Sequence, residues 1–172
     1  GGALLDGTDD RFDLTTPLSL ERFHLFVVVD LDTLTNQTFF GSSTNAGNFI
    51  RITDADTYRH KARNGSEVVI FDYTSGKTLS DNTKFMYEVV RSADETIEVF
   101  RNNGEHLTAT PSGSNASSLL ATFAINQLFT QQNNSTNING HVFEFVLFGK
   151  EQTGDNLTNV RNDILTRNGL HV

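Results

Sequence analysis

The stretch Gly140–Gly149 constrains the fold more than any other part of the sequence, because an extended strand here would be apolar on both faces. Alternation gives one side Phe143, Phe145 and Leu147, and the other side Val142, Glu144, Val146 and Phe148. A strand that is apolar on both sides is usually a central strand with a layer above it and another below it. We therefore expect this segment in the middle of a sheet.

The residues after Lys150 change from strand spacing to helix spacing. Leu157, Val160 and Ile164 recur at helical intervals. Thr153 has a residue type suited to the N-cap, and Asn168-Gly169 suits the C-cap. The spacing predicts one short amphipathic helix that covers the strand before it.

The rest of the chain is rich in short strands and turns. Phe23–Leu31 gives the clearest strand pattern of the first half, again with apolar residues on both faces, and Asn64-Gly65 is typical of a hairpin turn. Thr15–Leu20 is predicted to be a connector, because Pro17 cannot occupy a central strand. About a dozen strands at this turn spacing indicate a sandwich or barrel. No repeat or linker divides residues 1–172, so we expect one all-β domain.

Composition narrows the range of partners. The chain has 13 Lys and Arg against 21 Asp and Glu, a net charge of −8, which argues against binding to nucleic acid or anionic membranes. No run is long and apolar enough for insertion into a membrane. Cysteine is absent, so disulfides and thiolate metal sites are excluded. The chain begins with Gly1-Gly2 rather than Met, and we expect a domain excised from a longer protein.

Four segments resemble the laminin-G-like, concanavalin A-like domains of the lectin and glucanase superfamily. Leu5–Leu14 is similar to the family's Asp-rich opening, and Phe23–Asp30 to its second long strand. Tyr87–Glu105 resembles a family hairpin that ends in Asn-Gly, and Ile138–Gly169 resembles the closing strand and helix. The chain departs from the pattern at Gln152-Thr153, where the family usually has Leu, and in the helix, where the family's Glu-Arg pair is absent.

The resemblance implies a two-sheet antiparallel jelly-roll β-sandwich with one short C-terminal α-helix. Such domains are commonly glycan-binding or adhesive modules. We therefore expect a non-catalytic glycan- or host-surface-binding module of a larger protein, located outside the cell or on a virion surface. One alternative is a structural or assembly domain of a phage fibre or capsid, forming a homo-oligomer through its parent protein. The other is a glycoside hydrolase or polysaccharide lyase.

The candidate ligand-binding residues gather in the middle of the chain: Arg51, Asp56, Tyr58, Arg59, His60, Arg63 and Tyr73. Arginine and tyrosine can hold a sugar by bidentate hydrogen bonds and ring stacking. Because the chain has no Trp, tyrosines would have to provide the stacking surface. The alternative interpretation is a solvated edge hairpin whose charges discourage pairing with other chains.

Two carboxylate features complete the candidates. Asp6, Asp9 and Asp10 surround a turn that suits either a structural Ca²⁺ ion or a turn held by Asx hydrogen bonds. Glu144 is the only charged residue of its strand; it either marks a site or pairs with an arginine or a backbone donor to fix the helix. A hydrolase would need a second carboxylate about 5–10 Å away, for which Asp30 is the candidate. The E-x-D-x-x-E motif of the glucanases is absent, so we expect no enzyme and no required cofactor.

Overall fold

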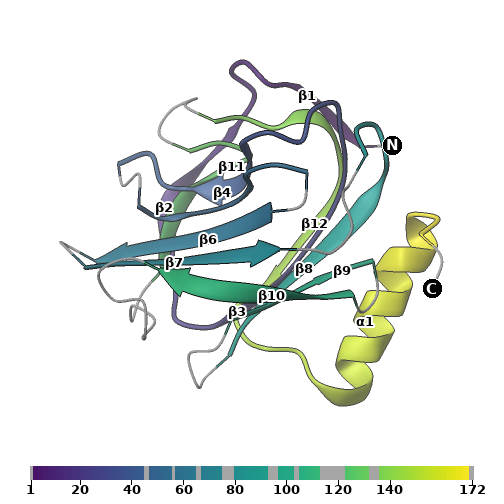
Figure 1. The fold of residues 1–172 in the computed structure, drawn as a ribbon. Helices are drawn as coiled ribbons and strands as arrows, with labels where there is room; N and C mark the ends of the chain where they lie inside the picture. Colours follow the sequence, from purple (N-terminus) through teal and green to yellow (C-terminus); the bar gives the residue numbers. More distant parts are fainter. Residues whose placement is uncertain are drawn as a thin grey trace.

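The described part of the chain forms two stacked antiparallel β-sheets and one helix (Figure 1). The structure is a computed structural model that describes residues 2–44, 47–55, 57–64, 67–74, 80–92, 97–102, 105–112, 123–131 and 136–170. Sheet A has the order β1 (Ala3–Asp6), β12 (Asn139–Phe148), β3 (Phe23–Leu31), β8 (Phe85–Arg91), β9 (Ile97–Arg101), β10 (Glu105–Ser112). Sheet B has the order β7 (Glu67–Thr74), β6 (Thr57–Asn64), β5 (Phe49–Ile52), β4 (Gln37–Gly41), β11 (Phe123–Leu128), β2 (Phe12–Leu20). These observations confirm the predicted all-β sandwich with one helix.

Strand β10 connects the two sheets. Its first half pairs with β9 in sheet A, through Glu105–Leu107, and its second half pairs with β7 in sheet B, through Thr108–Ser112. The opposite side of the sandwich stays open and carries the two edge strands, β1 and β2. Pro17 lies in β2, which includes the segment predicted to be a connector. That prediction was wrong, because an edge strand tolerates a residue without a backbone N–H donor.

The centre of sheet A is β3 rather than β12. All but one residue of β3 is buried, and the strand pairs along its length with β12 on one side and β8 on the other. In β12 only Asn139–Val142 has β1 as a second neighbour, so Phe143–Phe148 forms the margin of the sheet. The predicted layers above and below β12 are nevertheless present, because sheet B covers one face and α1 the other.

A β-bulge in β12 changes which side chains share a face. The pairing with β3 shifts between Val142 and Glu144, which leaves Phe143 as the extra residue. Val142 consequently points into the core between the sheets with Phe145 and Leu147, whereas Phe143 faces the helix. The strict alternation predicted from sequence was therefore wrong for Val142 and Phe143.

Helix α1 (Gly154–Arg167) covers the outer face of sheet A and is the yellow element in Figure 1. Ile164 and Leu165 are buried against Phe26, Val28 and Met86. Thr153 occupies the N-cap position with an extended backbone, although its hydroxyl makes no capping bond. Burial of Ile164 and Leu165 contributes about 2 kcal/mol each, which exceeds what the missing cap bond would add.

Candidate functional site on the outer face of sheet B

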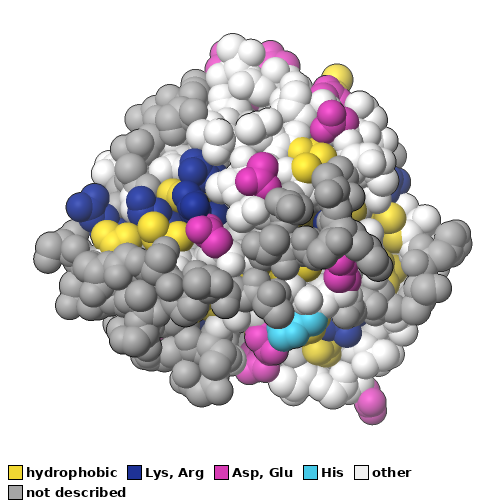
Figure 2. Space-filling view, viewed as in Figure 1, with side chains coloured by type: hydrophobic (Ala, Val, Ile, Leu, Met, Phe, Trp, Pro, Cys, Tyr) yellow, Lys and Arg dark blue, Asp and Glu magenta, His cyan; other side chains and the backbone are white. Residues whose placement is uncertain are grey.

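The exposed side of sheet B carries a patch of basic side chains that we call the basic patch: Arg51, Arg59, Lys61 and Arg63. In the register of the sheet, Arg51 of β5 lies directly opposite Arg59 of β6. Lys61 and Arg63 follow at two-residue intervals along β6 and therefore share that face. Figure 2 shows Lys and Arg side chains gathered on this side of the molecule. Because the chain has a net charge of −8, the patch is a local reversal of charge.

Asp72 of β7 holds Arg59 in place. Arg59 Nε donates to Asp72 Oδ1 at 2.6 Å, and Arg59 Nη2 donates to Asp72 Oδ2 at 2.8 Å. This bidentate pair raises the pKa of Arg59, although partial burial of the side chain opposes the increase. The contact fixes the guanidinium plane on the sheet.

Arg51 is held by an aromatic ring rather than by an acid. Its guanidinium carbon lies 4.4 Å from the centre of the Phe49 ring, and Lys61 Nζ lies 5.7 Å from the same ring. Arg51 Nε is buried and has no hydrogen-bond partner in the described part of the chain. Burial and, second, the charge of Arg59 lower the pKa of Arg51.

The pKa of Lys61 is lowered, as is that of Arg51. Burial lowers the pKa of Lys61, and the neighbouring charges of Arg63, Arg51 and Arg59 lower it further. Like charges directly opposite each other in a sheet cost up to about 1 kcal/mol, so this arrangement does not stabilise the fold by itself. An anion bound between these cations would relieve the repulsion.

The structure separates the predicted ligand-binding residues into two layers. Arg51, Arg59 and Arg63 face outward, whereas Tyr58, His60 and Tyr73 are at most 1% exposed and point into the core. Sugar contact by Tyr58, His60 and Tyr73 was therefore predicted wrongly, because alternate residues of a strand point to opposite faces. Tyr58 packs against Tyr73 and Tyr87, and His60 lies between Phe23 and Phe123. Asp56 lies outside the described residues.

Two members of the site, Phe49 and Asp72, were not among the predicted residues. Phe49 precedes Arg51 by two residues and therefore shares its face of β5. Asp72 meets Arg59 through the β6–β7 register, in which Asn64 pairs with Glu67 and Arg59 pairs with Asp72. A two-residue turn at Asn64-Gly65 would instead have paired Arg59 with Ile70, so the predicted turn does not lead to the Arg59–Asp72 contact.

The acidic turn brings its three predicted residues together. Carboxylate oxygens of Asp6, Asp9 and Asp10 lie within 4.8 Å of one another. Two of these side chains also accept backbone N–H groups: Asp6 Oδ1 from Thr8 at 2.8 Å, and Asp10 Oδ2 from Asp6 at 2.9 Å. These hydrogen bonds make the turn an Asx-type turn, one of the two interpretations offered by the sequence.

Glu144 has the structural role that the sequence analysis gave as one alternative. Its Oε1 accepts from Arg167 Nη2 at 2.5 Å and its Oε2 accepts from Asn168 Nδ2 at 2.7 Å. Both donors belong to the C-terminal end of α1. The carboxylate therefore fastens the helix to β12, and both of its oxygens are engaged.

Among the described residues, no helix is long and apolar enough to cross a lipid bilayer.

Solved structures share this architecture. The CBM40 of a Ruminococcus gnavus IT-sialidase, bound to α2,3-sialyllactose, superposes with a TM-score of 0.65 at 14% identity, covering 93% of this chain and 95% of that chain. A heptameric SAP-like pentraxin from Limulus polyphemus gives 0.57 at 7% identity, covering 88% of this chain and 75% of that one. The chain has the concanavalin A-like fold.

A third similar structure is a larger protein. A putative carbohydrate-binding protein from Bacteroides ovatus gives a TM-score of 0.55 at 13% identity, covering 87% of this chain but 46% of that chain. No protein-family model and no curated protein sequence matches the chain. Sequence identities of 7–14% establish the shared fold but do not assign any residue of this chain to a binding site.

Proposed function

We propose that this domain is a non-catalytic glycan-binding module that holds an acidic saccharide on the basic patch. The observation that carries the proposal is the pair of opposed arginines on the outer face of sheet B, one anchored by Asp72 and the other seated on Phe49. Two guanidinium groups at neighbouring strand positions suit the oxygens of a carboxylate or a sulfate, each of which can accept two parallel N–H bonds.

The similar structures support glycan binding, although they do not identify the binding residues of this chain. One is a carbohydrate-binding module with sialyllactose bound, and another is a putative carbohydrate-binding protein. A bound sialic acid would present the carboxylate that the patch is suited to receive. The resemblance stated from sequence supports placement of the module in a larger extracellular or virion protein.

Calorimetric titration with free sialic acid and with α2,3-sialyllactose tests the proposal. Arg51→Ala is expected to weaken both ligands at least about ten-fold, because a charge-assisted contact to a desolvated carboxylate is lost. Arg51→Lys keeps the charge but not the planar fork and should give an intermediate loss. Lys150→Ala, which removes an exposed cation elsewhere, serves as the matched control.

Unchanged affinity in Arg51→Ala would remove the basic patch from the binding site. Absence of binding to these two ligands and to a panel of sulfated and uronic-acid oligosaccharides would reject the acidic-saccharide proposal as a whole. Thermal melts of each variant establish that a loss of binding is not a loss of fold.

A further inference from the structure

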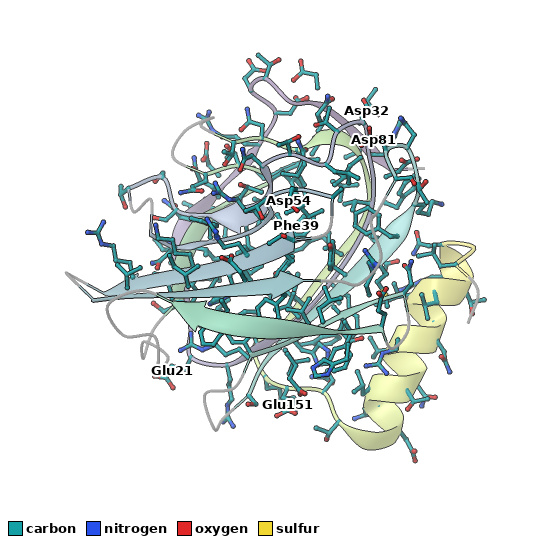
Figure 3. The ribbon with its side chains drawn as sticks, viewed as in Figure 1. Glu21, Asp32, Phe39, Asp54, Asp81 and Glu151 are labelled. Atoms are coloured by element: carbon teal, nitrogen blue, oxygen red, sulfur yellow. The ribbon has the colours of Figure 1, made fainter. Side chains whose placement is uncertain are left out.

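A cleft of about 610 Å³ opens at the end of the sandwich, beside the turn between β5 and β6. Three segments that are separate in sequence line it: Thr33–Thr35, Asp54-Ala55 and Ser80-Asp81. Figure 3 labels Asp54 and Asp81 from two of these segments. The volume lies within the range of small-ligand sites, which is about 300–1,000 Å³.

Hydrogen bonds between the three segments hold the cleft in a fixed shape. Asn82 N–H donates to Leu31 O at 2.8 Å, which ties the third segment to the end of β3. Asn36 N–H donates to Thr53 O at 3.4 Å and joins the first segment to the second. Asn36 and Asn82 both have a φ of 55°, a left-handed conformation that asparagine tolerates better than most residues.

A buried glutamine braces the first segment from within. Gln37 is 4% exposed, and its Nε2 donates to Thr33 Oγ1 and to Thr35 O, each at 3.0 Å. Its Oε1 accepts the N–H of Asn139 at 2.7 Å, so the same side chain connects the segment to β12. A cleft built in this way loses little conformational entropy when a ligand enters it.

The lining is chemically opposite to the basic patch. Asp54 and Asp81 contribute carboxylates and Thr33, Thr35 and Ser80 contribute hydroxyls. Leu34, which is 6% exposed, and Ala55, which packs on the main core, add apolar surface. Carboxylates accept hydrogen bonds strongly and repel anions, so this lining suits a ligand with many hydroxyl donors, no negative charge and an apolar ring face.

The β5–β6 hairpin contributes to both the cleft and the basic patch. Thr53 N–H donates to Thr57 O at 2.9 Å and closes the turn that carries Asp54. Arg51 and Arg59 form the second residue pair from Thr53 and Thr57, about 7 Å away along the strands. The carboxylate of Asp54 also acts on Arg59, whose pKa it helps to raise.

We propose that this cleft is a second saccharide subsite, which binds a neutral sugar residue linked to the acidic residue on the basic patch. The inference rests on the proposed function and deepens it, because it names the ligand class as an oligosaccharide with an acidic unit joined to a neutral one. Asp54 and Asp81 accept hydroxyl hydrogens of the neutral unit, and Leu34 and Ala55 contact its ring.

Titrations with three probes separate the two subsites. α2,3-Sialyllactose should bind about ten-fold more tightly than free sialic acid, because only the trisaccharide reaches the cleft. Asp81→Asn should remove that difference and leave the affinity for free sialic acid unchanged. Asp32→Asn is the matched control, because Asp32 is an exposed carboxylate at the same end of the sandwich that does not line the cleft.

Amide chemical shifts during a lactose titration give a readout that does not depend on the patch. Lactose should shift the amide signals of Leu34, Ala55 and Asp81 while leaving those of Arg51 and Arg59 in place. Equal affinities for sialic acid and sialyllactose, together with no lactose-induced shifts at the cleft, would overturn the second subsite and leave the basic patch standing. Lactose shifts at the cleft without any effect of Arg51→Ala would instead overturn the patch.

Discussion

The imidazole of His60 is expected to make the domain less stable in mild acid. His60 is fully buried, and neither ring nitrogen has a hydrogen-bond partner in the described part of the chain. Its ring centre lies 4.8 Å from that of Phe123 and 6.3 Å from that of Phe23. Burial and, second, the charge of Arg91 lower its pKa to about 3, from an ordinary value near 6.5.

The sign of the effect follows from proton binding. Between pH 6.5 and pH 3 the unfolded chain carries a proton on His60 and the folded chain does not, so acid favours unfolding throughout this window. Between pH 8 and pH 5 the two pKa values give a loss of about 2 kcal/mol in the free energy of unfolding. Because pH 5 is well above the folded pKa, this figure depends mainly on the unfolded value.

Urea denaturation followed by circular dichroism at pH 8 and pH 5 measures this loss. His60→Phe replaces the imidazole with an apolar ring and should reduce the pH dependence by about 2 kcal/mol relative to the parent. His106→Gln is the control, because the side chain of His106 is half exposed, and it should keep most of the parent's pH dependence. An equal loss of stability in the parent and in His60→Phe would refute the reasoning, as would an NMR titration of His60 with a midpoint near 6.5.

Two further predictions concern the helix and the acidic turn. Glu88 is fully buried and accepts one hydrogen bond from His24 and two from Arg161. Glu88→Gln should therefore lower the free energy of unfolding, measured by urea denaturation, by about 3 kcal/mol. A loss below about 1 kcal/mol would contradict the structural importance of this network. Burial acts to raise the pKa of Glu88, but these hydrogen bonds lower it on balance, so its contribution should be present above the unfolded pKa of about 4.3 and decline as the pH falls through the folded value. Backbone N–H groups already bond to oxygens of Asp6 and Asp10, so millimolar Ca²⁺ should raise the melting temperature by less than about 1 °C. A larger rise that Asp9→Asn abolishes would instead assign a calcium site to the turn.

Much of sheet A could be read from residue order. The segment Phe23–Leu31 is apolar on both faces, and each face meets its own apolar layer, the inter-sheet core or the helix. The helix ends close to the predicted caps, where Leu170 N–H donates to Leu165 O and Gly169 has a φ of 66°. These features are local, because strand alternation and helix capping depend on neighbouring residues.

The candidate site depended on tertiary structure to a larger extent. Strand β6 has one face of Tyr58, His60 and Ala62 and another of Arg59 and Lys61, and both faces contain polar atoms. Only the packing of sheet B on sheet A decides that the first face is buried, because the tyrosine and imidazole rings can fill the core while the cations remain in water. The charges in the sequence predict the basic patch, but they do not predict that Tyr58 and His60 are buried on the opposite face of the sheet.

Long-range contacts decided the remaining features. The bulge at Phe143 follows from pairing with β3, and the cleft follows from the meeting of segments around residues 34, 54 and 81. The amino-acid order thus determined the periodicity of the strands and the helix, because those preferences act within a few residues. The tertiary structure alone decided which polar groups meet, because hydrogen bonds and charges act between atoms that folding brings together from distant parts of the chain.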